Sequence, residues 1–138
     1  MTDKVFLDTN LWIYLYGTQP IEKSRKVREL VSDASHSVQI STQVLGEMFH
    51  VLTRKKLVSK AEATEIITKL TRRFPILEID TSHVLKAIDI SNRYNYSYWD
   101  SLIIATALLS DCTTVYSEDM QHNQLIDDRT RICNPLLG

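Results

Sequence analysis

The sequence is poor in the residues that build linkers, disordered segments and disulfide frameworks. Its 138 residues include only 3 Gly, 3 Pro and 2 Cys. So few Gly and Pro leave little room for flexible linkers, and we expect a single domain over residues 1–138. Cys112 and Cys133 lack metal-ligand spacing and are typical of buried thiols, although a disulfide between them stays open until their distance is known.

Excess charge and long hydrophobic runs are scarce too. The formal net charge is -1, so any nucleic-acid contact would depend on local basic patches. The longest apolar segment, residues 102–109, is too short to cross a bilayer. The first residues also lack the basic and apolar regions of a signal peptide. We therefore expect a cytoplasmic protein without a membrane partner.

Short apolar runs alternate with segments of helical periodicity along the chain. The runs predict strands, and the periodic segments predict helices. Such alternation favours a three-layer α/β/α domain around a mainly parallel sheet of four to five strands. We expect a loop at 17–20, strands near 5–7, 37–41, 75–79, 113–117 and 131–134, and helices near 11–15, 22–34, 42–55, 59–74, 80–94 and 98–109.

Polar residues at the predicted helix starts indicate how these helices are capped. Thr42 is a candidate N-cap for the third helix, and Asp80 or Thr81 for the fifth. Ser59 and Glu62 have the spacing of a capping box at the start of the fourth helix. The final helix is apolar almost all round, which predicts that it lies buried in the domain.

Four acidic residues lie where a carboxylate is costly unless something compensates it. Asp8 follows the first predicted strand and Asp119 follows the fourth. If these strands are parallel, both carboxylates open onto the same edge of the sheet. Glu47 and Asp100 have apolar neighbours one helical turn away, so they lie on the buried faces of their helices.

Each of these acids has a simpler interpretation on its own. Asp8 and Asp100 could be helix N-caps, Glu47 could extend into water, and Asp119 could be a turn residue. Together they are harder to explain, because no Lys or Arg is obviously placed to pair with each. Close buried acids repel one another unless a cation binds, and hard divalent cations take oxygen ligands. A second metal or nearby basic residues must then offset the remaining negative charge.

Segments along essentially the whole chain resemble the PIN-domain family, most closely the VapC-type ribonuclease toxins of bacterial type II toxin–antitoxin pairs. The matching parts are Phe6-Leu7-Asp8-Thr9-Asn10, Glu47, Trp99-Asp100-Ser101-Leu102-Ile103-Ile104-Ala105 and Tyr116-Ser117-Glu118-Asp119-Met120. Where relatives commonly have Gly in the last loop, this chain has Asn123, which also tolerates positive φ. The resemblance implies a PIN-like α/β/α fold and metal-dependent endoribonuclease activity.

The resemblance also implies which residues form the active site. An acidic quartet would carry catalysis and hold Mg²⁺ or Mn²⁺: Asp8, Glu47, Asp100 and Asp119. Asp119 follows from the family register, and Glu118 is the alternative. Small polar residues would orient carboxylates or water through hydrogen bonds: Thr9, Asn10 and Ser117.

The chemistry expected of such a site is hydrolysis of an RNA phosphodiester, with water made more acidic by the ion. Arg54 and Lys55 continue the Glu47 helix and could hold the RNA backbone, and His122 could contact a phosphate or water. Solvated surface is the default interpretation for each of these residues, and for His50 as well. The aromatic residues are expected mostly in the core or at partner surfaces, with base stacking as an open alternative.

The partners implied by the resemblance are an RNA substrate, a cognate antitoxin and a second copy in a homodimer. Two other functions stay open. One is a PIN nuclease in RNA processing without an antitoxin. The other is a catalytically silent PIN module that binds RNA or protein, against which the intact quartet argues. A phosphatase is disfavoured, because the turn after Asp8 lacks a second Asp at the usual offset.

Overall fold

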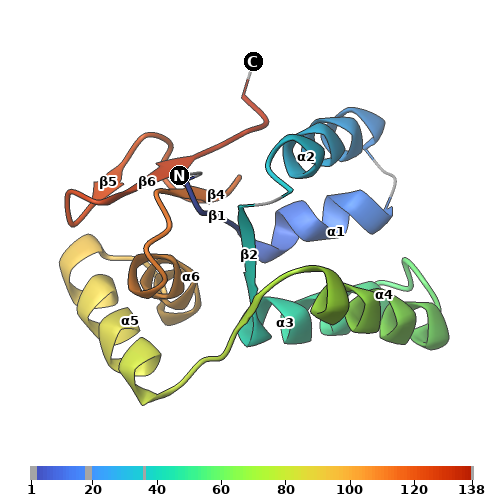
Figure 1. The fold of residues 1–138 in the computed structure, drawn as a ribbon, viewed down its shortest axis with the longest axis horizontal. Coiled ribbons are helices and arrows are strands. Elements are labelled where there is room, and N and C mark those ends of the chain that lie inside the picture. The colour runs from blue at the N-terminus through green and yellow to red at the C-terminus, as the bar shows by residue number, and fades with distance from the viewer. Residues whose placement is uncertain (1–2, 18–19, 36, 138) are drawn as a thin grey trace.

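A six-stranded, mainly parallel sheet forms the centre of the protein (Figure 1). The computed structural model describes residues 3–17, 20–35 and 37–137. The strand order is β3-β2-β1-β4-β6-β5, and only the β5–β6 pair is antiparallel. The strands are β1 (Val5–Leu7), β2 (Val38–Ser41), β3 (Ile76–Leu77), β4 (Thr114–Tyr116), β5 (Leu125–Ile126) and β6 (Thr130–Cys133).

The predicted α/β class is confirmed, but the expected count of four to five strands is wrong by one. The additional strand, β5, has only two residues, too few to show an alternating pattern. It is joined to β6 by a turn in which Asp127 and Asp128 both have positive φ, 51° and 54°. Such a turn is normally signalled by Asn-Gly or Asp-Gly, which is why this hairpin leaves little trace in the sequence.

Six helices flank the sheet in the described part of the chain (Figure 1). In space α5 packs along α6, α1 contacts both α2 and α3, and α3 contacts α4. Positions 18 and 19 of the expected loop at 17–20 lie outside the described residues. The helices are α1 (Thr9–Gly17), α2 (Ile21–Asp33), α3 (Thr42–Arg54), α4 (Lys60–Arg73), α5 (Thr81–Tyr94) and α6 (Tyr98–Leu109).

Capping residues fix where most of these helices begin. The capping box of Ser59 and Glu62 at α4 is confirmed, and Asp80 rather than Thr81 caps α5. The predicted cap of α3 is wrong by one residue. Ser41 accepts a hydrogen bond from the Val44 amide, whereas Thr42 accepts one from the Ile79 amide near β3. Both Ser and Thr are good N-caps, so the sequence alone does not choose between neighbours.

Helix α6 lies in the core, as its composition predicts. Every residue from 101 to 108 is buried. Trp12 of α1 is also buried, with its ring 5.4 Å from that of Phe74 in an edge-to-face contact. Cys112 and Cys133 are both free thiols, which settles the open question of a disulfide. Over the described ranges, no helix combines the length and apolar character needed to span a membrane.

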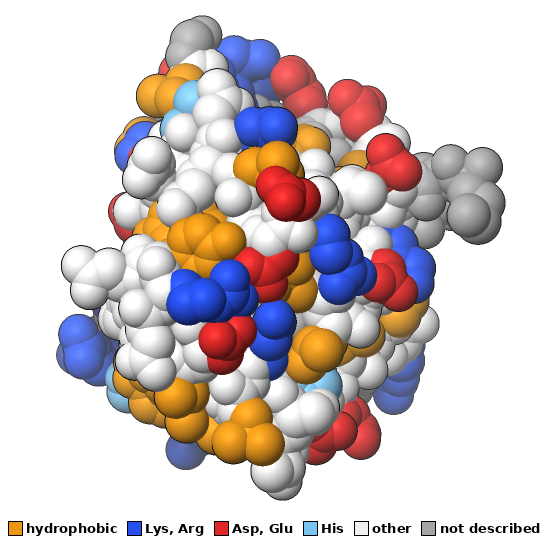
Figure 2. Space-filling model, turned by 90° about the vertical axis from the view of Figure 1, so that its left-hand side faces the viewer, with side chains coloured by type: hydrophobic (Ala, Val, Ile, Leu, Met, Phe, Trp, Pro, Cys, Tyr) orange, Lys and Arg blue, Asp and Glu red, His pale blue; other side chains and the backbone are white. Residues whose placement is uncertain are grey.

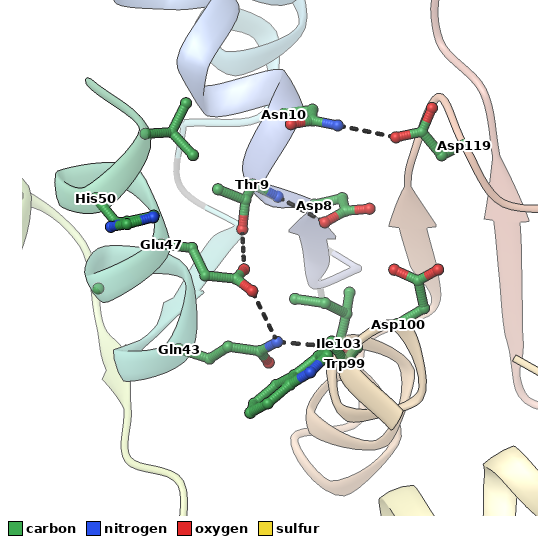
Figure 3. A pocket seen from close by; sticks show the side chains of 12 residues that line it. Asp8, Thr9, Asn10, Gln43, Glu47, His50, Trp99, Asp100, Ile103 and Asp119 are labelled. Carbon is green, nitrogen blue, oxygen red and sulfur yellow. Dashed lines mark hydrogen bonds between the residues drawn. The ribbon is translucent and has the colours of Figure 1, made fainter. Parts of the chain in front are cut away.

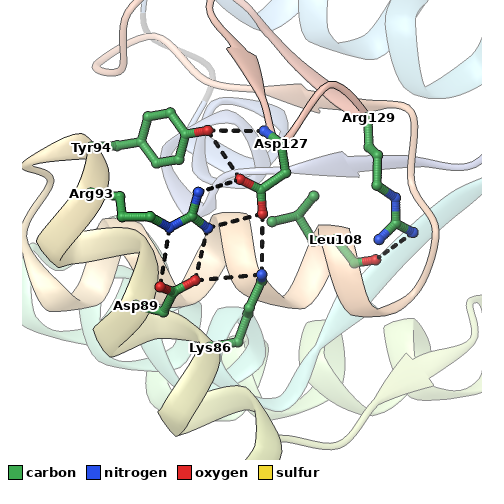
Figure 4. A network of polar contacts seen from close by, with 7 residues as sticks. All are labelled: Lys86, Asp89, Arg93, Tyr94, Leu108, Asp127 and Arg129. Atoms are coloured by element: carbon green, nitrogen blue, oxygen red, sulfur yellow. Dashed lines mark hydrogen bonds and ion pairs between the residues drawn. The ribbon is translucent and has the colours of Figure 1, made fainter.

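A polar network joins α5 to the β5–β6 turn (Figure 4). Asp127 accepts hydrogen bonds from Arg93 at 2.6 and 3.0 Å, from Lys86 at 3.1 Å and from the Tyr94 hydroxyl at 3.0 Å. Asp89 adds a second carboxylate that Arg93 also binds. These contacts hold the pKa of Asp127 well below its usual range, chiefly through Arg93. We call Lys86, Asp89, Arg93, Tyr94 and Asp127 the α5 network.

The surface around this network mixes both signs of charge. Figure 2 views the molecule from the side where α5 and β5 lie in Figure 1. Basic and acidic side chains alternate across its centre, between patches of hydrophobic side chains (Figure 2). This face therefore shows no broad basic region of the kind that would follow an RNA backbone.

Candidate active site

The pairing of β1 with β4 places the polar residues that follow these strands at one edge of the sheet. Leu7 is level with Tyr116 in this parallel pair, so Asp8 and Ser117 come next to each other. The Asp8 amide donates to the Tyr116 carbonyl at 2.9 Å and the Ser117 hydroxyl donates to the Asp8 carboxylate at 3.0 Å. The carboxyl edge of the sheet is therefore closed by hydrogen bonds between residues 109 positions apart.

A pocket of about 440 Å³ opens at this edge, between α1, α3, α6 and the loop after β4 (Figure 3). All four acids of the implied quartet line it: Asp8, Glu47, Asp100 and Asp119. Their side chains reach the pocket from four segments that are distant in sequence (Figure 3). The structure thus brings together the acids that the sequence singled out separately.

Asp8 is half-buried at the edge of the sheet, and its pKa is strongly perturbed. Its pKa is raised from 3.8 to about 6, chiefly by burial, with a smaller contribution from the carboxylates of Asp100 and Glu47 and against the hydrogen bonds from Ser117 and the Thr9 amide. The Thr9 amide, at the start of α1, donates to Asp8 at 2.7 Å. Asp8 therefore serves as a helix-cap acceptor and as a wall of the pocket at once.

Glu47 projects from α3 toward Asp8. Its carboxylate accepts a hydrogen bond from the buried Thr9 hydroxyl at 2.6 Å and a longer one from the Gln43 amide at 3.5 Å. Gln43 also donates to the backbone carbonyl of Trp99 at 3.2 Å, so it links α3 to the start of α6. These neutral donors fix the position of Glu47 but leave its negative charge uncompensated.

Asp100 lies in the first turn of α6 but does not cap this helix. Ser97 does, by accepting a hydrogen bond from the Asp100 amide at 3.1 Å. The carboxylate of Asp100 is therefore free to face the pocket (Figure 3). Burial raises its pKa, and the neighbouring charges of Asp119 and Glu47 raise it further.

The two adjacent acids after β4 point to different places. Asp119 lines the pocket and accepts a hydrogen bond from the Asn10 amide at 2.8 Å. Glu118 turns toward α1 and α2, where it accepts from the Tyr14 hydroxyl at 2.7 Å and forms an ion pair with Lys23. The geometry therefore favours Asp119 over Glu118 as the fourth acid of the pocket.

No Lys or Arg within the described ranges forms an ion pair with any acid of the quartet. An oxygen-rich, uncompensated site of this kind suits a hard divalent cation. No three His, Cys, Asp or Glu side chains of the described residues are grouped closely enough to enclose an ion by themselves. Because Mg²⁺ usually keeps several waters and takes only one or two carboxylates, the donor set fits a partly hydrated ion and not a closed protein cage.

The other implied site residues divide into two groups. Thr9, Asn10 and Ser117 donate hydrogen bonds to Glu47, Asp119 and Asp8, the contacts expected of residues that orient carboxylates. The remaining three candidates do not line the pocket. Arg54 and Lys55 lie at the exposed end of α3, and the His122 ring accepts a hydrogen bond from the Asn134 amide at 2.9 Å.

Several pocket residues were not selected from the sequence. His50, for which polar surface was the favoured interpretation, lines the pocket, and so do Gln43 and Trp99. Gln43 and His50 are respectively four residues before and three after Glu47, so they share its helix face. This spacing was a usable signal in the sequence. No comparable signal indicated that Trp99 is exposed, because an aromatic residue at a helix start is normally expected in the core.

Comparison with known proteins identifies the family of this fold. A family model described as the PIN domain matches residues 5–126, which is most of the chain. The chain belongs to the PIN-domain family. No curated protein sequence matches it.

Solved structures of similar fold include a toxin and toxin–antitoxin complexes. One is the sarcin–ricin loop cleaving toxin VapC20 of Mycobacterium tuberculosis, with a TM-score of 0.69 and 22% identity over 84% of this chain and 90% of that one. A toxin–antitoxin complex from Klebsiella pneumoniae has a TM-score of 0.73 and 16% identity, over 96% and 98%. DNA-bound VapBC from Salmonella typhimurium has a TM-score of 0.67 and 20% identity, over 95% and 97%. At such identities the likeness establishes a shared fold.

Proposed function

We propose that this PIN domain is a metal-dependent endoribonuclease that hydrolyses RNA phosphodiester bonds as the toxin of a toxin–antitoxin pair. The observation that carries the proposal is the pocket at the carboxyl edge of the sheet, where four carboxylates converge without a cationic partner among the described residues. Burial, together with the neighbouring carboxylates, raises the pKa of Asp8 and Asp100, so the arrangement costs stability. A bound cation would offset that cost, which gives the arrangement a chemical purpose.

In this proposal Asp8 and Asp100 are the main ligands of Mg²⁺ or Mn²⁺. When bound, the ion lowers the pKa of water and neutralises charge on a phosphate. Glu47 and Asp119 act through water or hold a second ion. Thr9 fixes one oxygen of Glu47, whose other oxygen receives only the longer hydrogen bond from Gln43 at 3.5 Å. Asn10 fixes one oxygen of Asp119 and leaves the other available to accept a proton or a water hydrogen bond.

The toxin assignment extends the proposal to partners. The Klebsiella structure is a toxin–antitoxin complex, and the Salmonella structure is a DNA-bound VapBC complex. We infer a cognate antitoxin for this chain, a homodimer of the toxin and a cytoplasmic location. The acidic pocket also suggests how an antitoxin would inhibit the site. A basic side chain placed among the carboxylates would replace the cation electrostatically.

The decisive experiment compares RNA cleavage by the purified wild type and by Asp8→Asn. Total cellular RNA is incubated with each protein in Mg²⁺, in Mn²⁺ and in chelator. We expect fragments from the wild type only, and only with metal. Asp127→Asn is the matched control, because it also neutralises a hydrogen-bonded Asp, but in the α5 network. Equal cleavage by wild type and Asp8→Asn would refute the proposed mechanism.

A separate experiment tests the toxin role. Expression of the wild type in a bacterial host should arrest growth, whereas expression of Asp8→Asn should not. Co-expression of a small DNA-binding protein encoded beside the gene should restore growth and yield a stable complex. Metal-dependent RNA cleavage without growth arrest or such a neighbour would point to an RNA-processing nuclease.

A further inference from the structure

The lining of the pocket is of two chemical kinds. Beside the four carboxylates lie Trp99 and Ile103 of α6, which Figure 3 labels, and Val51 and the backbone of Gly46 on α3; we call these four residues the apolar wall. A hydrated ion with six ligands occupies at most roughly 180 Å³, taking about 30 Å³ for each water. The pocket holds about 440 Å³. Such an ion would therefore fill less than half of the pocket.

Trp99 is exposed although tryptophan is normally well buried. Its exposed fraction is 62%, against 1% for Trp12, and among the described large hydrophobic residues it is the sole exposed aromatic. Tyr98 holds it from the side, with ring centroids 5.0 Å apart at 77°. The hydrogen bond from the Gln43 side-chain amide to the Trp99 carbonyl fixes the main chain of Trp99. Trp99 is thus an anchored ring whose surface is open at the mouth of the pocket.

Gly46 leaves one position of α3 beside the pocket without a side chain. Glycine inside a helix is less stable than alanine, so its presence calls for a reason. A Cβ at this position would meet nothing within 4 Å, so close packing is not the reason. The position opens directly onto the pocket. A side chain there would project into space that the present sequence leaves empty.

We propose that Trp99 and this apolar wall form a nucleobase subsite, in which the base next to the scissile phosphate stacks on the Trp99 ring. The inference rests on the proposed function. Base stacking on aromatic side chains is worth about 1–3 kcal/mol, or roughly 5- to 150-fold in affinity, and is tolerant of sequence because every base has a flat face. When a phosphate lies among the acids, the base of the same nucleotide lies near the apolar wall, because one ribose joins the phosphate to the base.

Electrostatics make such a contact necessary. The protein has a net charge of -1 and the pocket is acidic, so the RNA backbone is repelled until a cation binds. Arg54 and Lys55 do not line the pocket and do not offset this repulsion at the reacting phosphate. Stacking supplies affinity that depends little on charge. A protein partner is less suited to this wall, because Trp99 is a single ring beside carboxylates and not part of a broad apolar patch.

The test measures cleavage kinetics on a short RNA that contains the mapped cut site, with Trp99→Ala, Trp99→Phe and Leu85→Ala. Leu85 is the matched control, because it is 63% exposed but lies on α5, away from the pocket. We expect Trp99→Ala to lower kcat/KM by roughly 10- to 100-fold, mainly through KM, and Trp99→Phe to retain most activity. Leu85→Ala should match the wild type. Gly46→Leu should raise KM while preserving the fold, because leucine is a good helix former.

A second arm removes the base instead of the ring. An RNA with an abasic nucleotide beside the cut should lose the same factor with wild type, but little more with Trp99→Ala. Unchanged kinetics of Trp99→Ala, or an abasic loss that is equal in both proteins, would overturn the subsite while the nuclease stands. Loss of antitoxin binding without loss of RNA cleavage would instead make Trp99 a protein-docking residue. No cleavage by wild type would refute the nuclease and the subsite together.

Discussion

Two clusters of acidic residues in this PIN domain show opposite electrostatics. In the α5 network each carboxylate is paired with Arg93 and Lys86, and the pKa of Asp127 is lowered, chiefly by Arg93. In the pocket, the acids receive hydrogen bonds from Thr9, Asn10 and Ser117, and the pKa of Asp8 is raised to about 6, chiefly by burial. The first arrangement stabilises the fold, while the second destabilises it until something positive binds.

The difference separates acids that stabilise the fold from acids that we propose bind a cation. Both clusters have well-formed hydrogen bonds, so the number of contacts does not separate them. The charge of the donors does. Cationic donors make a carboxylate more acidic, whereas burial with neutral donors leaves it basic and able to attract a cation. Four comparisons between paired variants measure this contrast, in order of decreasing effect.

The largest contrast is in catalysis. Asp8→Asn removes a proposed metal ligand, and we expect RNA cleavage to fall on the order of a thousandfold, since a bound ion stabilises the transition state by several kcal/mol. Asp127→Asn should cleave within about twofold of wild type, because Asp127 lies in the α5 network and not in the pocket. Initial rates on one labelled RNA measure both. A comparable loss in the two variants would erase the distinction between the clusters.

The next contrast concerns stability without metal, where Asp8→Asn and Asp127→Asn should change the free energy of unfolding in opposite directions. Folded Asp8 binds a proton up to about pH 6, whereas the unfolded chain releases it near 3.8, so the free energy of unfolding falls as pH rises between these values. The full difference corresponds to about 3 kcal/mol. Asp8→Asn should therefore be more stable than wild type by up to that amount at pH 8 in chelator, and equally stable near pH 4.

Asp127→Asn should instead lose about 1 kcal/mol at pH 7, because its partly exposed ion pairs are worth little more. Its lowered pKa means that the contribution of Asp127 is present at neutral pH and lost as pH falls below about 4. Asn still tolerates the positive φ of this turn, so the backbone is not a confounding factor. Urea unfolding at pH 4, 7 and 8 measures the difference in free energy of unfolding between each variant and wild type. Differences of the same sign for the two variants would contradict the comparison.

The third contrast concerns hydroxyl donors. Ser117 donates to Asp8, and Tyr94 donates to Asp127, each at 3.0 Å. Ser117→Ala should reduce cleavage or metal affinity roughly 10- to 100-fold, as expected for a group that orients a metal ligand. Tyr94→Phe should leave cleavage unchanged and cost about 1 kcal/mol of stability. Titrating the metal while following activity distinguishes the two variants. Weakened metal binding in Tyr94→Phe would contradict the claim that only the pocket hydroxyl supports the metal.

The smallest effect is expected at Glu118, which neighbours the pocket in sequence but resembles the α5 network in its contacts. Glu118→Gln weakens the ion pair to Lys23 that holds the segment before Asp119. Because partly exposed ion pairs are weak, we expect at most about a fivefold fall in kcat/KM. Lys23→Gln is the matched partner variant and should give the same fall. A loss as large as that of Asp8→Asn would place Glu118 in the pocket chemistry.

Much of this molecule was predictable from its sequence, for identifiable reasons. The parallel α/β architecture followed from alternating strands and helices, and the buried α6 followed from its apolar composition. The meeting of Asp8, Glu47, Asp100 and Asp119 in one pocket followed from strand ends, helix faces and the family resemblance.

The remaining features depend on geometry that leaves no pattern in one chain. The β5 strand is too short to alternate, and the choice of Ser41 over Thr42 as N-cap rests on a single hydrogen bond. The opposite directions of Glu118 and Asp119 are decided by Lys23 and Tyr14, which are remote in sequence. The exposure of Trp99 is likewise a property of the assembled surface.

The hydrogen bond from Ser117 to Asp8 also shows at what stage of protein synthesis the pocket can form. It joins residues 109 positions apart, across strands that must pair before the acids meet. A ribosome that has just produced β1 has yet to add about a hundred residues before β4 is available to complete the edge. A growing chain therefore carries dispersed acids and no pocket. The nuclease activity proposed for this domain would therefore depend on a sheet that closes only late in synthesis.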